Sequence, residues 1–227
     1  MTLRNNARVA GVAFLLYIAF AFPSMMLFGR ATSGEAMPAK LSNVADHAAN
    51  VRISVLLSVL CCFCALTLAA TLYRLTRDVD PDLARIAMLC RAGEGIVGGA
   101  ALPVTAAVLW VATAMRAGSL EAVSAQSLAA FLLKAGEWNT LVGSILFAAG
   151  STLFAWLFLR GRLIPVWLAW VGVIGSALVL LVIWLRLAGL AEGLVTQVVW
   201  LPVAIFELVL AFRLILKGTA APATPRS

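Results

Sequence analysis

The chain has 227 residues, of which 63% are apolar and 12% charged, and its net charge is +7. Soluble domains average about 45–50% apolar and about 25% charged residues, and burial on folding rises only slowly with chain length, so this composition excludes a soluble globular protein. The positive charge comes without a Lys/Arg run, a zinc-ligand spacing or an RNP-like motif. It therefore argues against nucleic acid as a partner and favours the anionic headgroups of a lipid bilayer.

Six apolar segments follow one another along the chain, each long enough to cross a hydrocarbon core of ~30 Å as a helix of about 20 residues. This pattern predicts an all-α fold, an integral membrane bundle of six transmembrane helices in one domain over residues 1–218. Residues 219–227 are rich in Pro, Ala and Thr, and we expect them to form a disordered tail. The expected helices cover residues 9–28, 51–73, 86–115, 128–159, 165–187 and 198–216.

Polar segments and helix-breaking residues separate the expected helices. The segment 29–50 is polar and contains Pro38, so we expect a loop there. Asp80 precedes Pro81 in the next break, and a residue before proline disfavours helical backbone. Asp82 then suits the positive end of the third helix. The remaining breaks are expected at residues 116–126, at Gly161 before Pro165, and at residues 188–197.

The distribution of Lys and Arg predicts the orientation, because cytoplasmic loops of membrane proteins are enriched in both. With the N-terminus inside, ten basic residues lie on the inner side and six on the outer side, and six helices return the C-terminus to the cytoplasm. Arg4 and Arg8 before an apolar run are also typical of a signal peptide, but the sequence around Pro23 is a poor cleavage site. We therefore expect the first segment to remain as a helix.

Three ionisable residues fall inside expected helices, where charges are costly and usually face the bundle interior. Arg91 and Glu94 lie three residues apart on one face of the third helix, and Glu207 lies in the sixth. Glu94 is nine residues from Arg85, and Glu207 is ten from Lys217. A rise of ~1.5 Å per residue puts both carboxylates roughly 13–15 Å from the inner boundary. Their shared depth predicts an ion pair of Arg91 with Glu207 or with Glu94.

This group has two interpretations: an ion-pair clip that fixes how the third and sixth helices pack, or a site that binds a cation, a proton or a polar headgroup. Glu137 and Asn139 lie near the outer end of the fourth helix, beside Trp138. They are either further ligand-binding candidates or a polar helix end at the interface. Pro103 and Pro202 lie toward the outer ends of their helices, where kinks would widen the bundle toward a cavity.

The sequence offers no pattern for a metal, a cofactor or a catalytic triad. The single histidine, His47, is expected in the first outer loop and cannot ligate a haem from both sides. The four cysteines lack histidine partners, and we expect reduced thiols within helices rather than zinc ligands. We therefore assign no catalytic residue, no metal and no cofactor. The cysteines are Cys61, Cys62, Cys64 and Cys90.

Short motifs stand in a fixed order from the end of the second expected helix to the end of the sixth. They are Leu72-Tyr73-Arg74, Arg91 to Glu94, Trp138, Leu159 to Pro165 with Trp167, and Leu201-Pro202 to Glu207 followed by Lys217-Gly218. Over nearly the whole chain, this order resembles a family of bacterial membrane proteins catalogued as domain-of-unknown-function family 4386. The resemblance implies a multi-pass protein of the bacterial inner membrane, and it implies no activity. The position of Glu137 is similar to one often held by Asp in that family.

The favoured hypothesis is a non-enzymatic membrane protein that binds or transports a small ligand, ion or lipid in a bundle cavity lined by Arg91, Glu94 and Glu207. One alternative is a structural or accessory subunit of a membrane complex. Another is an intramembrane enzyme, which would need a water-accessible carboxylate pair. The expected partners are the lipid bilayer and the small ligand, with a homo-oligomer left open.

Overall fold

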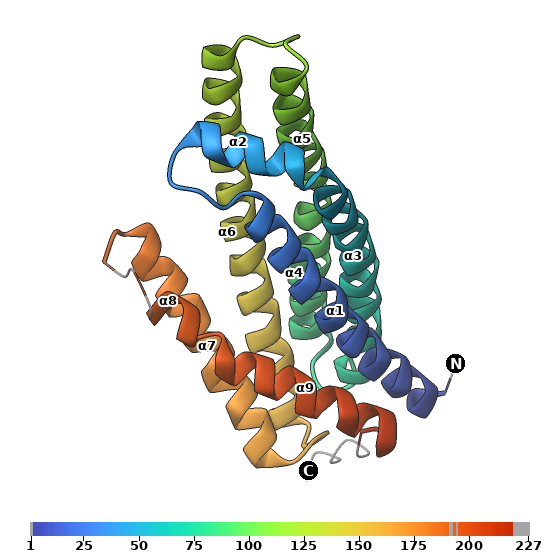
Figure 1. Ribbon diagram of the computed structural model, residues 1–227. Coiled ribbons are helices and arrows are strands. Elements are labelled where there is room, and N and C mark those ends of the chain that lie inside the picture. The colour runs from blue at the N-terminus through green and yellow to red at the C-terminus, as the bar shows by residue number, and fades with distance from the viewer. Residues whose placement is uncertain (1, 191–192, 194, 220–227) are drawn as a thin grey trace, which may run out of the picture. The chain divides into compact units, whose positions relative to one another are not determined.

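The computed structural model describes residues 2–190, 193 and 195–219, and its regular elements are helices (Figure 1). Six stretches of helix are long and apolar enough to cross a membrane, so the predicted all-α integral membrane fold with six transmembrane helices is confirmed. The predicted tail lies outside the described residues, apart from Thr219. The six spans are Leu3–Ala31 (α1), Ala48–Thr76 (α3), Pro81–Arg116 (α4 and α5), Ala122–Arg160 (α6), Val166–Leu187 (α7) and Thr196–Leu216 (part of α8, and α9).

A further helix, α2 (Met37–Asp46), lies in the segment expected to be a loop, and that expectation was wrong. Pro38 stands in the first turn of α2, where its missing N–H would have no helical partner in any case. Leu41 and Val44 lie about one turn apart on α2, and both are buried. Pro38 therefore starts a short helix with one apolar face instead of breaking one.

The contacts between residues divide the chain into two compact units. Unit 1 comprises Met1–Leu16, Cys64–Gly95 and Gly143–Ser227. Unit 2 comprises Tyr17–Phe63 and Ile96–Val142. Each unit is described separately below, and the single domain over residues 1–218 stays a prediction.

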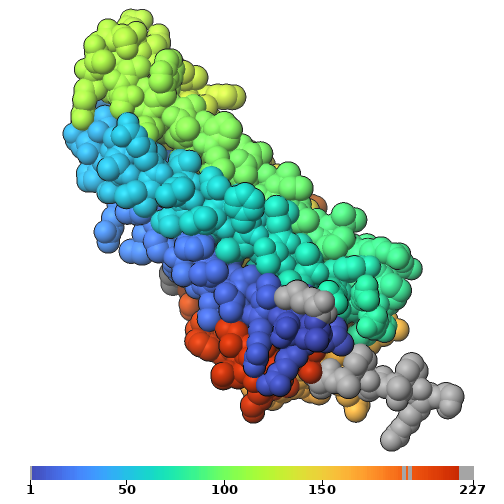
Figure 2. Space-filling view, turned by 90° about the vertical axis from the view of Figure 1, so that its right-hand side faces the viewer, coloured from blue at the N-terminus to red at the C-terminus, as the bar shows by residue number. Residues whose placement is uncertain are grey.

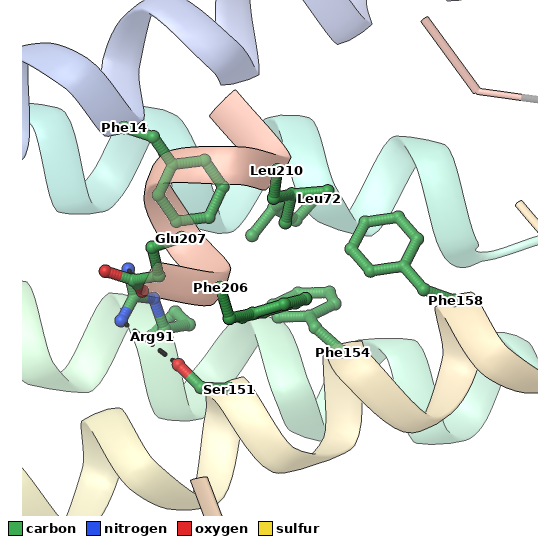
Figure 3. A pocket seen from close by; sticks show the side chains of 9 residues that line it. All are labelled: Phe14, Leu72, Arg91, Ser151, Phe154, Phe158, Phe206, Glu207 and Leu210. Atoms are coloured by element: carbon green, nitrogen blue, oxygen red, sulfur yellow. Dashed lines mark hydrogen bonds and ion pairs between the residues drawn. The ribbon is translucent and has the colours of Figure 1, made fainter. Parts of the chain in front are cut away.

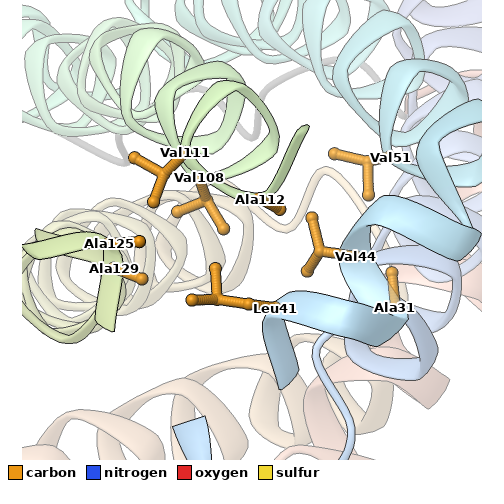
Figure 4. Packing of buried hydrophobic residues seen from close by; sticks show 9 residues of the cluster. All are labelled: Ala31, Leu41, Val44, Val51, Val108, Val111, Ala112, Ala125 and Ala129. Carbon is orange, nitrogen blue, oxygen red and sulfur yellow. The ribbon is translucent and has the colours of Figure 1, made fainter. Parts of the chain in front are cut away.

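Unit 2 has a core of small aliphatic side chains where α2 packs on α5 (Leu102–Arg116), as Figure 4 shows. Arg116, in the last turn of α5, holds the end of α2 through an ion pair with Asp46 at 2.6 Å. It also donates a hydrogen bond to the Ser42 carbonyl at 3.2 Å. The core cluster consists of Ala31, Leu41, Val44, Val51, Val108, Val111, Ala112, Ala125 and Ala129.

The third span is interrupted at Ala101, between α4 (Pro81–Ala100) and α5. Pro103 follows two residues later and has no N–H to donate to the preceding turn. The Ala101 N–H donates to the Gly98 carbonyl at 3.2 Å, one residue short of its regular helical partner, Val97. The predicted distortion at Pro103 is therefore a break between two helices. Pro202 instead lies in the first turn of α9 (Leu201–Leu216), after the short helix α8 (Val195–Val198).

Glycines bring the helices of unit 1 close together, α7 against α9 above all (Figure 1). A Cβ on Gly172 of α7 would lie 2.6 Å from the ring of Phe206 in α9. A Cβ on Gly11 of α1 would lie 2.6 Å from the Ala211 carbonyl oxygen, and Figure 2 shows the start of α1 beside the end of α9. Small residues allow such close packing in lipid, where hydrophobic burial does not drive helices together. Gly172 therefore allows α7 and α9 to approach closely.

Candidate functional site

Arg91, in the middle of α4, is the centre of a buried polar cluster in unit 1. Its side chain is only 1% exposed. One end of the guanidinium, Nη1, lies 3.0 Å from Glu94 Oε2 and donates a hydrogen bond to Ser151 Oγ of α6 at 3.4 Å. The other, Nη2, lies 3.6 Å from Glu207 Oε1 of α9. The structure thus brings together all three residues predicted to share a depth, and α6 joins them (Figure 3).

Two residues of α6 shape the space around the guanidinium. Arg91 Cζ lies 4.6 Å from the centre of the Phe147 ring, within the range of a cation–π interaction. Phe147 in turn packs on Trp200, with ring centres 5.6 Å apart. Gly150 leaves room for the arginine stem, because a Cβ there would lie 2.9 Å from Arg91 Cγ. The Arg91 side chain therefore packs against Phe147 and Gly150 of α6 and also pairs with two carboxylates.

The cluster holds two carboxylates for one guanidinium. Glu94 and Glu207 are 8% and 5% exposed, so both lie away from water. If all three groups are ionised, the cluster carries a net charge of −1. An uncompensated charge is costly inside a membrane protein, and binding one positive charge would remove that cost. The buried cluster therefore contains one more carboxylate than guanidinium.

A small cavity of ≈ 10 Å³ lies against Arg91, Ser151 and Glu207 (Figure 3). This is about the volume that one water molecule needs. The three polar residues contact only one part of the cavity, and the rest of its wall is hydrocarbon. Its apolar lining residues are Phe14, Leu72, Phe154, Phe158, Phe206 and Leu210. The site as it stands thus has the size of a water molecule, far below that of a lipid headgroup.

The other two predicted site residues, Glu137 and Asn139, belong to unit 2 and have local partners there. Glu137 pairs with Lys134 at 2.8 Å on the exposed side of α6. The Asn139 amide donates a hydrogen bond to the Val97 carbonyl at 2.9 Å. In a regular helix the Val97 carbonyl would accept the Ala101 N–H, which here donates to Gly98 instead. Asn139 thus replaces the missing donor and stabilises the α4–α5 break. A ligand-binding role for either residue stays a prediction.

Sequence reasoning missed the contribution of α6 to the cluster. Ser151 and Phe147 are ordinary residues in an apolar helix, and neither belongs to a motif. A signal was nevertheless present, since Ser151 is nine residues before Arg160. At ~1.5 Å per residue this is the depth already calculated for Glu94. Counting polar residues as well as charged ones would have placed α6 at the site.

Six membrane-spanning helices, with an Arg–Glu–Glu cluster buried in unit 1, define a multi-pass helical membrane protein. Residues 9–218 match the family model described as Domain of unknown function (DUF4386), and the chain belongs to this family. The resemblance seen in the sequence motifs is therefore confirmed. Comparisons with curated proteins and with solved structures gave no match.

Proposed function

We propose that this membrane protein binds a proton at the cluster of Arg91, Glu94 and Glu207, and that the bound proton controls how α9 packs on α4. The observation that carries this proposal is that two buried carboxylates share one guanidinium. Ionisable groups inside membrane segments commonly form proton relays and ion pathways. A proton would bring the net charge of the cluster to zero.

The surroundings of the cluster favour a proton over a metal cation. Alkali and alkaline-earth cations need several oxygen ligands, and the cavity wall supplies side-chain oxygens from Ser151 and Glu207 only. The Arg91 guanidinium on the same wall would repel a metal cation. The cavity volume of ≈ 10 Å³ suits a proton, or one water molecule that carries it, and not an organic ligand.

Within the cluster, Glu207 is the better candidate for the proton. Its distance to the guanidinium is 3.6 Å, against 3.0 Å for Glu94, so its negative charge is less well compensated. Arg91 and Glu94 both lie on α4, and their pair would survive protonation of Glu207. Protonation would, however, remove the ion pair between α9 and α4. Proton-coupled transport requires that proton binding shifts the equilibrium between two conformations. A proton that changes the packing of α9 on α4 would do so.

The test is pH-difference infrared spectroscopy of the full chain in lipid nanodiscs, which detects the C=O stretch of protonated carboxyl groups. We expect a carboxyl band that appears as the pH falls and that is lost in Glu207→Gln. In Glu94→Gln the band should appear only at lower pH, because Glu207 then shares the guanidinium with no other carboxylate. Glu35→Gln is the control, because Glu35 is exposed. An identical difference spectrum for wild type and Glu207→Gln at every pH would refute the proposal.

A packing clip is the second candidate, and the arrangement around Arg91 supports it. One side chain joins α4, α6 and α9, which would fit a structural subunit of a membrane complex. A pure clip would keep both carboxylates ionised at all pH values at which the protein remains folded, so no titrating carboxyl band would appear. An intramembrane hydrolase finds less support, because Glu94 and Glu207 are buried beside a cavity lined mostly by phenylalanine and leucine.

We also infer that the protein lies in a bacterial inner membrane with both termini in the cytoplasm. The excess of basic residues on one side of the six spans supports this orientation. In a cysteine-free variant, Thr2→Cys and Ser119→Cys would mark the two sides. A membrane-impermeant thiol reagent added to intact cells should label Ser119→Cys and leave Thr2→Cys unlabelled. The reverse pattern would overturn the inferred orientation.

A further inference from the structure

The ends of four helices meet at one end of unit 1. The Asn6 amide, in the first turn of α1, donates to the Thr71 carbonyl near the end of α3 at 2.8 Å. Arg160, the last residue of α6, pairs with Asp80 between α3 and α4 at 2.8 Å. Gly161 then packs under the same connection, because a Cβ on it would lie 2.5 Å from Val79. We call this region the basic end, since arginine and lysine dominate it.

The acidic residues of the basic end are already paired. Asp78 lies 3.6 Å from Arg77, Asp82 lies 2.7 Å from Arg85, and Asp80 pairs with Arg160. Within the described part of the chain, four further exposed basic residues of this end form no ion pair. The basic end therefore carries a positive surplus that its own carboxylates do not balance. These four residues are Arg4, Arg8, Arg162 and Lys217.

Arg162 stands out among these four by its backbone. Its φ of +50° is left-handed, and no other described residue except glycine has a positive φ. Its neighbours Gly161 and Leu163 are buried, which fixes the direction of the exposed arginine between them. Glycine or asparagine would occupy this conformation with less strain. Strained backbone of this kind is concentrated at functional sites. The long, positively charged side chain of Arg162 is therefore a candidate contact for a ligand.

Exposed tryptophans lie on the same corner. Trp156 is 42% exposed and precedes Arg160 by one turn of α6, and Trp167 is 61% exposed in the first turn of α7. Tryptophan is enriched at the level of the lipid headgroups, where its ring is partly in hydrocarbon and partly in water. Arg162 lies between these two tryptophans in the chain.

We propose that the α6–α7 corner of the basic end is a binding site for an anionic phospholipid, with Arg162 contacting the headgroup phosphate. Arg4, Arg8 and Lys217 add the surrounding positive field. A basic residue near an anionic membrane surface strengthens binding about fivefold. This site is independent of the proton-binding cluster.

The test compares phosphatidylglycerol with phosphatidylcholine bound to the full chain, measured by native mass spectrometry from mixed micelles. We expect Arg162→Gln to reduce the preference for phosphatidylglycerol about fivefold, and Arg162→Lys to retain most of it. Arg186→Gln is the matched control, because it removes the same charge from an exposed arginine at the far end of α7. Its preference should equal that of wild type.

Two results would overturn the proposal. One is an equal preference for phosphatidylglycerol in wild type, Arg162→Gln and Arg186→Gln. The other is full displacement of phosphatidylglycerol by inorganic phosphate at millimolar concentration, which would assign the site to a free anion. Arg162→Gly separates the backbone strain at residue 162 from lipid binding. Without lipid, this variant should unfold at a higher temperature than wild type. It should still lose the preference for phosphatidylglycerol.

Discussion

Two ion pairs of this protein have the same spacing but opposite surroundings. Arg91–Glu94 in unit 1 and Lys134–Glu137 in unit 2 are both separated by three residues on a helix, with distances of 3.0 and 2.8 Å. The side chains of the first pair are 1% and 9% exposed, and those of the second are 66% and 61% exposed. Geometry alone would rank them equal. Because the first pair is buried, removing one partner would strongly destabilise the fold. The second pair is exposed and contributes little to stability.

The largest expected effect comes from removing the cation of the buried pair. Arg91→Gln leaves Glu94 and Glu207 buried without their counter-charge, so we expect the free energy of unfolding to fall by about 3–5 kcal/mol. Lys134→Gln should change it by less than about 1 kcal/mol. Reversible unfolding by SDS in mixed micelles measures both. Equal losses for the two variants would contradict the difference in burial.

A rescue variant sharpens this result. Replacing Glu94 and Glu207 by Gln in the Arg91→Gln background removes every charge from the cluster. Because the main cost of Arg91→Gln is the uncompensated charge, we expect this triple variant to recover most of the lost stability. Failure to recover would mean that the contacts of the guanidinium with Phe147 and Ser151 provide the stability instead.

Helix packing around Arg91 gives the next largest effect. Gly150→Ala places a methyl group 2.9 Å from Arg91 Cγ and 3.1 Å from Cys90 Cβ, which should cost about 1–3 kcal/mol of unfolding free energy. Gly136→Ala is the control on the same helix, since its nearest contact is Val104 at 4.0 Å. The control should be neutral or more stable, by up to about 1 kcal/mol. An unchanged unfolding free energy in Gly150→Ala would show that α6 can move to accommodate the added methyl group.

The six spans and the shared depth of Arg91, Glu94 and Glu207 could be predicted because both depend on periodic properties of a helix. Apolar length identifies a span, and the rise per residue gives a depth. The role of Ser151 could not be inferred from charge. Helix α2 was missed for a different reason: Pro38 has opposite effects inside a helix and in its first turn, and only the burial of the following residues distinguishes the two.

A third pair, Arg160–Asp80, has intermediate exposure, with side chains 55% and 30% exposed. The hydrogen bond from the Leu83 N–H, and then the Arg160 charge, hold the pKa of Asp80 below its ordinary value, although partial desolvation opposes them. A lowered pKa in the folded state means that ionised Asp80 stabilises the protein above its ordinary pKa. This contribution is lost as the pH falls through the lowered value.

Asp80→Asn tests this pH dependence. Asparagine can still accept the Leu83 N–H at the start of α4, but it carries no charge for Arg160. We expect wild type to be more stable than the variant at neutral pH, and the difference to shrink as the pH falls through the lowered pKa of Asp80. Asp78→Asn is the control, because Asp78 is an exposed neighbour with a longer pair distance of 3.6 Å. A difference that stays constant with pH would contradict the assignment of the stabilisation to the ionised carboxylate.

The smallest effect is expected at the exposed pair itself. Glu137→Gln should lower the unfolding free energy by about 0.2–0.5 kcal/mol, and added salt should abolish even this, since the pair is exposed. Glu94→Gln, with the same spacing, should respond little to salt because its pair is buried. Measuring both variants at low and high salt separates burial from spacing. A loss of stability in Glu137→Gln that does not depend on salt would mean that Glu137 is shielded from water in the membrane. The Lys134–Glu137 pair would then not behave as an ordinary surface ion pair.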